Sequence, residues 1–140
     1  NAFSFSPPAE AACLGWYAAA QGFNGFLRWA YDSWTENPLY DTRYVKWPAG
    51  DCYMVYPGGR SSIRFERLRE GIQDFEKLQI LKTRLEQLNT AEAQVCLMQL
   101  RAALGRFTFD SVRKSPCDKL LQQGQKTLFE TSRFVVEQTP

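Results

Sequence analysis

Hydrophobic residues recur at three- and four-residue steps in the second half of the chain, which is the spacing of a helix with one buried face. The clearest run covers residues 63–88, and a capping serine, Ser61 or Ser62, precedes it. Charged residues, among them Glu70 and Asp74, occupy the positions between the hydrophobic ones. The pattern therefore predicts a long amphipathic helix with Glu70 and Asp74 on its exposed face.

Two further helices are predicted after this one. The polar pair 89–90 interrupts the pattern and can cap a helix over 91–104, which Gly105 would end. A last helix is predicted from Ser-Pro at 115–116 to about residue 137. Apolar and polar side chains alternate only weakly over residues 106–112, so this segment predicts either an edge strand or an extended connector.

The first part of the chain has a different pattern. Residues 1–5 (NAFSF) alternate apolar and polar side chains, and residues 26–31 (FLRWAY) form a compact apolar and aromatic run, so both predict strands. Between them we expect a helix that Ser6 caps and that ends near Gln21, before Gly22. Such a unit implies two parallel strands joined by a right-handed crossover. A parallel sheet needs more partners than these, so the sheet is expected to be incomplete.

A loop of nearly thirty residues separates the second predicted strand from the long helix. Loops of this length in compact domains are usually functional rather than simple connectors. This one is unusually aromatic, which favours a binding role. Its rings are Trp34, Tyr40, Tyr44, Trp47, Tyr53 and Tyr56.

Composition narrows the chemistry. The 140 residues include 17 basic and 15 acidic ones, a net charge of +2 that gives a polyanion little to bind, so we expect neither nucleic acid nor a membrane as partner. The chain has no His, which excludes imidazole bases and ligands, and its four Cys form no C-x-x-C pair, so we expect no metal site and no cofactor. Disulfides between the cysteines stay open.

Several uncommon segments of the chain resemble segments of one protein family and occur in the same order. They are RWAYDSW at 28–34, WPAGD at 47–51, YPG at 56–58 and SIRFERLREGIQD at 62–74. Over about residues 5–82 the chain resembles the end of the catalytic domain of glycoside hydrolase family 123, which occurs in many bacterial proteins.

The resemblance implies a fold and an activity. The family has a (β/α)8 barrel and cleaves β-linked N-acetylgalactosamine, with an Asp-Glu pair on earlier strands. By this resemblance the fold class is α/β: residues 1–88 would hold the last two strands of a TIM barrel, and residues 89–140 a helical extension. The catalytic pair would lie outside this chain, which would then have no catalytic residue and no activity by itself. An extracytoplasmic location would follow from the same relatives.

The carboxyl ends of barrel strands and the loops after them carry the reacting groups. We therefore expect a sugar-binding role for residues at the end of the second strand and in the aromatic loop. Aromatic rings stack on the apolar face of a sugar, and carboxylates bind its hydroxyl groups. An alternative is that Trp29 and Tyr31 fill the protein core. The candidate substrate-binding residues are Trp29, Tyr31, Asp32, Trp34, Asp51 and Tyr56.

Other interpretations stay open. The Gly-Gly turn at 58–59 before a helix is a weak sign of phosphate or nucleotide binding, because no Walker lysine accompanies it. Arg64 is expected to form an ion pair with Glu66 or Glu70 rather than to bind substrate. The chain could also be a non-catalytic helical domain that binds a protein or a sugar. If the sheet is incomplete, its exposed strand edges predict self-association.

Overall fold

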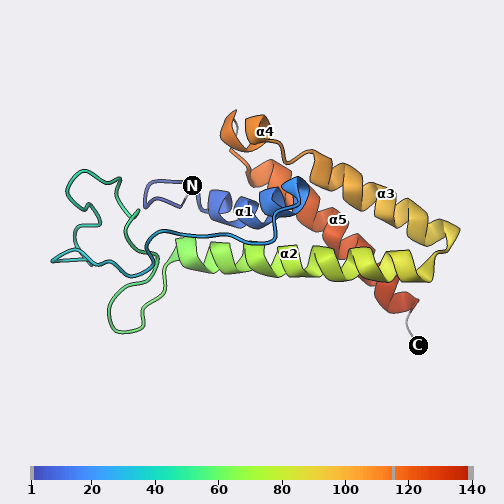
Figure 1. Ribbon diagram of the computed structural model, residues 1–140, viewed down its shortest axis with the longest axis horizontal. Coiled ribbons are helices and arrows are strands. Elements are labelled where there is room, and N and C mark those ends of the chain that lie inside the picture. Colours follow the sequence, from blue (N-terminus) through green and yellow to red (C-terminus); the bar gives the residue numbers. More distant parts are fainter. Residues whose placement is uncertain (1, 115, 139–140) are drawn as a thin grey trace.

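The computed structural model describes residues 2–114 and 116–138, which form helices and connecting loops (Figure 1). The longest helix, α2, forms the axis of the molecule. Helix α1 packs beside its first half and α3 and α5 beside its second, while the aromatic loop extends beyond its N-terminal end (Figure 1). The helices are α1 (Pro8–Gln21), α2 (Ile63–Leu88), α3 (Ala91–Gly105), α4 (Phe109–Lys114) and α5 (Asp118–Glu137).

The ends of α2 and the start of α3 agree with the sequence prediction. The Ser62 hydroxyl accepts a hydrogen bond from the Phe65 N–H at 3.1 Å, which satisfies one of the free donors of the first turn. Asn89 ends α2 in the left-handed conformation, at φ 48°. Thr90 then caps α3 by accepting from Ala93 N–H at 3.2 Å. The signals for this hairpin are local, so the sequence reveals them.

The predicted strands are absent from the described residues, so the α/β barrel-end fold class is wrong for this structure. Residues 4–6 form a turn, and residues 23–30 are extended without a pairing partner; Asn1 lies outside the described residues. A strand persists only when a neighbour pairs its N–H and C=O groups in a continuous ladder. Here the two segments make isolated bonds to the loop: Ser4 N–H donates to the Ala49 carbonyl, and the Tyr31 carbonyl accepts from Met54 N–H. Pairing in the described chain is limited to isolated antiparallel bridges: Asp32–Tyr53, Tyr44–Trp47 and Tyr56–Arg60.

The segment predicted as an edge strand or extended connector contains the short helix α4 instead. Thr108 and Ser111 cap it reciprocally: Ser111 N–H donates to the Thr108 hydroxyl at 3.1 Å, and Thr108 N–H donates to the Ser111 hydroxyl at 2.9 Å. Phe107 just before it is buried and stacks on Trp16, with ring centroids 5.0 Å apart. The apparent alternation is therefore a capping pair beside a buried ring.

Helix α1 crosses α2 with almost no side chain between them. It begins at Pro8 rather than at a Ser6 cap, and Gly22, at φ 71°, ends it as predicted. At the crossing, Gly15 lies against Gly71 so closely that a Cβ on either residue would overlap backbone atoms of the other helix. The two glycines therefore set the distance between the helices.

A buried carboxylate joins three helices. Asp74 of α2 is 7% exposed and accepts from the Trp16 indole N–H and from the Gln125 amide, both at 2.9 Å. The prediction that Asp74 lies on the exposed face is therefore wrong. Its position faces α1 and α5, and hydrogen bonds compensate the burial of its charge.

The main hydrophobic core takes side chains from both halves of the chain, including Trp16, Leu78, Leu97 and Leu121.

All four cysteines are free thiols. The hydrogen bond to Cys117 and, after it, burial raise the pKa of the Cys13 thiol, which keeps it protonated. Within residues 2–114 and 116–138, no helix has both the length and the apolar character needed to span a bilayer.

Candidate functional site

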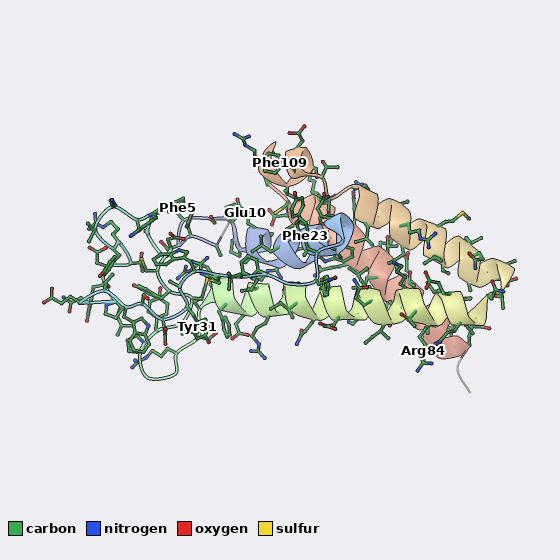
Figure 2. All side chains as sticks on the ribbon, viewed as in Figure 1. Phe5, Glu10, Phe23, Tyr31, Arg84 and Phe109 are labelled. Atoms are coloured by element: carbon green, nitrogen blue, oxygen red, sulfur yellow. The ribbon has the colours of Figure 1, made fainter. Side chains whose placement is uncertain are left out.

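The six residues singled out from the sequence lie in two hollows near the N-terminal end of α2, where Tyr31 is seen in Figure 2. The larger, about 470 Å³, is here called the aromatic hollow. The smaller, about 200 Å³, is called the tryptophan hollow. Tyr31, Asp32, Trp34 and Tyr56 line the aromatic hollow, whereas Trp29 and Asp51 line the tryptophan hollow.

The aromatic hollow combines ring faces with carboxylates. The Trp34 indole N–H donates to the Val55 carbonyl at 2.9 Å, which fixes a ring that is 43% exposed. Tyr31 meets the Phe65 ring edge-on, with centroids 5.7 Å apart. The exposed carboxylate of Asp32 lies in the same hollow. Such a surface can stack on one side of a sugar and accept hydrogen bonds from its hydroxyl groups.

Helix α2 adds Phe65 and two charged residues to this hollow, none of which was predicted to bind a ligand. Glu66 and Arg69 line it, and Arg69 donates to the Glu66 carboxylate at 2.8 Å. The Ser61 hydroxyl donates to the other carboxylate oxygen of Glu66. Because both oxygens of Glu66 are engaged, this carboxylate is held in one orientation.

The tryptophan hollow is organised by Trp29 and Asp51. The Trp29 indole N–H donates to the Asp51 carboxylate at 3.2 Å, and its ring packs on Trp47 with centroids 5.3 Å apart. Trp29 is 58% exposed and Tyr31 is 49% exposed. The alternative that these two rings fill the core therefore does not hold in this structure.

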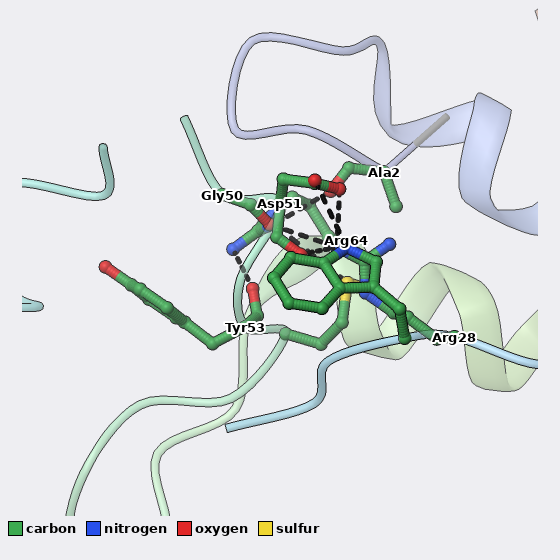
Figure 3. Close-up of polar contacts among 8 residues, drawn as sticks. Ala2, Arg28, Gly50, Asp51, Tyr53 and Arg64 are labelled. Carbon is green, nitrogen blue, oxygen red and sulfur yellow. Dashed lines mark hydrogen bonds and ion pairs between the residues drawn. The ribbon is translucent and has the colours of Figure 1, made fainter. Parts of the chain in front are cut away.

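A buried guanidinium lies beneath the loop (Figure 3). Arg64, 7% exposed, donates to the carbonyl oxygens of Ala2 at 2.8 Å, Gly50 at 2.6 Å and Tyr53 at 3.0 Å. The predicted ion pair of Arg64 with Glu66 or Glu70 is not formed. Arg64 points inward from α2 to the loop backbone, so it binds three carbonyl groups, one at the N-terminal end of the chain and two in the loop.

A second arginine joins this network from the extended segment (Figure 3). Arg28 donates to the carbonyl oxygens of Gly50 at 3.2 Å and Asp51 at 2.5 Å, and it lies 3.6 Å from the Asp51 carboxylate. Burial lowers the pKa of the Arg28 guanidinium, and the Asp51 charge opposes this change. The two arginines thus share the Gly50 carbonyl oxygen as acceptor, and Arg28 also holds the Asp51 carbonyl.

Sequence reasoning paired Arg64 with Glu66 or Glu70, although a signal for its burial was present. Arg64 precedes Leu68 by four residues and Gly71 by seven, so it lies on the stripe of α2 that is buried. A charged residue on such a stripe must find polar partners. Its contacts with backbone carbonyl groups, by contrast, leave no pattern in the sequence.

The rest of the loop is held by its own contacts. Tyr53 is buried, its hydroxyl donates to the Pro38 carbonyl at 2.9 Å, and burial raises its pKa. Arg43 binds the exposed Asp41 carboxylate and lowers its pKa to about 2. In the Gly-Gly turn, Arg60 donates back to the Pro57 carbonyl at 2.8 Å. The described residues contain no group of three or more His, Cys, Asp or Glu placed to hold a metal ion.

Comparisons with known proteins identify the family of this chain. Residues 1–81, more than half of the chain, match the family model of the glycoside hydrolase 123 catalytic domain. Among solved structures, the chain is similar to a family 123 glycoside hydrolase from Clostridium perfringens, a protein studied for glycolipid glycan hydrolysis, at 25% sequence identity and a TM-score of 0.71. That match covers 98% of this chain and 26% of that chain, so this chain spans about a quarter of that enzyme. No curated protein matches. The chain belongs to glycoside hydrolase family 123.

Proposed function

We propose that this chain forms one wall of the carbohydrate-binding site of a family 123 glycoside hydrolase, and that the sugar is β-linked N-acetylgalactosamine. The observation that carries the proposal is the gathering of Tyr31, Asp32, Trp34 and Tyr56 around one hollow. The family membership supports the carbohydrate class of the ligand. The choice of N-acetylgalactosamine rests on the resemblance of the loop and helix segments to that family.

The wall would recognise the sugar in two ways. The exposed face of Trp34, whose edge is fixed by its hydrogen bond to Val55, would stack on the C–H groups of the ring. The Asp32 carboxylate would accept hydrogen bonds from hydroxyl groups on the same ligand. Stacking supplies most of the affinity, and the hydrogen bonds orient the sugar.

We propose that the chain does not hydrolyse the glycosidic bond by itself. Glycoside hydrolysis needs an acid to protonate the leaving oxygen and a second group to stabilise the developing cation. In this hollow Glu66 is bound by Ser61 and Arg69, so it is poorly placed to donate a proton to a ligand. The acid pair would come from other parts of the catalytic domain.

The test is a titration of the chain with the methyl β-glycosides of N-acetylgalactosamine and of glucose, followed by NMR of the tryptophan indole N–H signals. We expect the indole signal of Trp34 to shift with a Kd on the order of 1 mM for the first glycoside, because one wall buries only part of the ligand. Trp34→Ala removes this signal, so its affinity is compared with that of the unaltered chain by calorimetric titration; binding should weaken about tenfold, the loss of one stacking ring. The chain should release no nitrophenol from nitrophenyl N-acetyl-β-galactosaminide.

The matched control is Phe129→Ala, which removes another exposed ring, on α5 and away from both hollows. It should bind the sugar as the unaltered chain does. Absence of binding, or equal binding after Trp34→Ala, would contradict the proposed wall. Turnover of the nitrophenyl substrate by the chain alone would show that an acid pair is present in it.

A second function, association with another protein surface, is favoured by one observation. Between α1, α2 and the extended segment lies a hollow of about 210 Å³ with mostly apolar lining. Apolar side chains beside it are exposed, among them Phe23 at 54%, Phe26 at 50% and Leu27 at 93%; Figure 2 shows Phe23. Residues 2–114 and 116–138 contain no strand, so the proposal of self-association rests on this apolar face instead of on strand edges.

Self-association is tested by sedimentation equilibrium over a range of protein concentrations. We expect the average mass to rise with concentration, and the double variant Phe26→Ser with Leu27→Ser to remain monomeric because it removes the exposed apolar surface. Val136→Ser, which alters an exposed valine on α5, serves as the control and should associate as before. A constant monomer mass for the unaltered chain would exclude self-association through this face.

A further inference from the structure

We propose that Arg64 is a positioning residue for sugar binding. Its buried guanidinium holds the Gly50 peptide so that Asp51 and Trp29 keep a fixed geometry in the tryptophan hollow. The inference rests on the proposed function and extends it, because it adds the tryptophan hollow to the wall proposed to bind the sugar. Arg64 itself lies beneath the loop and does not line either hollow.

The partners of Arg64 point to a geometric role. Burying a guanidinium costs free energy unless its N–H groups are satisfied. Among the described residues, its oxygen partners are backbone carbonyl groups, and no carboxylate forms an ion pair with it. Because Ala2 lies at the start of the chain and Gly50 and Tyr53 lie in the loop, this one side chain fixes both segments relative to α2.

The contact with Gly50 transmits this constraint to the hollow. Gly50 has φ 82°, and a Cβ there would lie 2.5 Å from the Arg64 guanidinium and 2.7 Å from the Ser4 nitrogen. The Gly50 carbonyl accepts from Arg64 at 2.6 Å and from Arg28 at 3.2 Å. Gly50 is thus held on two sides, in a conformation that other residues rarely adopt.

Asp51 follows directly in the chain and carries the constraint to the ring. Its carboxylate accepts from the Trp29 indole N–H at 3.2 Å and lies 3.6 Å from Arg28 (Figure 3). A rotation of the Gly50 peptide would therefore displace the carboxylate that orients Trp29. The path from Arg64 to Trp29 runs through contacts of 3.2 Å or less and one peptide bond.

The experiment compares Arg64→Ala, Arg64→Lys and Arg84→Ala in the full chain by NMR of the indole N–H signals, which W29F and W16F assign. Arg84 is an exposed arginine near the other end of α2 (Figure 2), so its variant controls for loss of charge from the helix. Trp16, bound to Asp74 in the helical core, is an internal reference for the fold.

In Arg64→Ala we expect the Trp29 signal to move toward the position of a free indole while the Trp16 signal stays. Binding of methyl N-acetyl-β-galactosaminide should weaken about tenfold, the loss expected for a buried hydrogen-bonding group that orients the site. Arg64→Lys keeps the charge without the planar fork, so both effects should be intermediate. Arg84→Ala should match the unaltered chain.

Two results would overturn the proposal. One is an unchanged Trp29 signal and unchanged sugar affinity in Arg64→Ala. The other is joint loss of the Trp16 and Trp29 signals in both Arg64 variants, which would make Arg64 a support of the whole fold. If the unaltered chain binds no sugar, the proposed function fails, and the Trp29 signal still decides whether Arg64 positions the hollow.

Discussion

Replacing Gly15 with alanine should destabilise the chain by about 3 kcal/mol or more. The new methyl group would overlap the carbonyl group of Gly71, which belongs to the backbone of α2 and cannot rotate away as a side chain would. The helices would have to separate, and the contacts between α1 and α2 on both sides of the crossing would loosen. The helix propensity of alanine exceeds that of glycine by only about 1 kcal/mol, which is less than the cost of the overlap. The substitution should therefore destabilise the chain.

Urea unfolding followed by far-ultraviolet circular dichroism measures this effect. Gly105→Ala is the matched control, because Gly105 is the last residue of α3 and a Cβ there meets no atom within 4 Å. It should leave the free energy of unfolding unchanged or raise it by up to about 1 kcal/mol. Equal stability of the two variants would mean that the helices can separate at this crossing at little cost.

Replacing Asp74 with alanine should lower the free energy of unfolding by about 2–4 kcal/mol. The Trp16 indole N–H is fully buried and would lose the acceptor that lies 2.9 Å away. The Gln125 amide would keep its bond to Glu70 and lose its bond to Asp74. Most of the cost therefore comes from one unpaired buried donor and the space left beside it.

The same urea unfolding measures this second effect, with the indole N–H signal of Trp16 as a local probe. Asp74→Asn keeps an oxygen acceptor and should cost less than the alanine variant. Gln73→Ala, at the exposed neighbouring position of α2, should change stability by no more than about 0.5 kcal/mol. A loss for Asp74→Ala as small as that for Gln73→Ala would show that the Trp16 hydrogen bond contributes little.

The error at Asp74 shows where a helical pattern becomes ambiguous. In the first half of α2 the buried stripe runs through Arg64, Leu68, Gly71 and Asp74, whereas Ile72 is 47% exposed. The positions of the apolar residues alone would place the buried face one residue away, at Ile72 rather than at Gly71. Close packing of α1 requires glycine on the stripe, and the buried charges are satisfied by partners distant in sequence, so the residue types do not reveal the face.

The candidate site was also predictable from the sequence only in part. An aromatic loop of this length indicates a binding surface, and the structure brings four of its expected residues, Tyr31, Asp32, Trp34 and Tyr56, around one hollow. The loop sequence did not indicate that Trp29 and Asp51 would line a second hollow. This arrangement depends on arginines that bind backbone carbonyl groups. Because every residue has such a group, the sequence does not show which ones are bound.

The sequence by itself determined the helices α2 and α3 and the turn between them, because caps and periodicity act within a few residues. It also carried the family resemblance, which the match over residues 1–81 confirms. Only the tertiary structure decided that residues 26–31 are not a strand, that α4 is a helix and that Arg64 anchors the loop. A strand exists only beside another strand, and a buried polar group is stable only beside its partners; both conditions depend on residues that are distant in sequence.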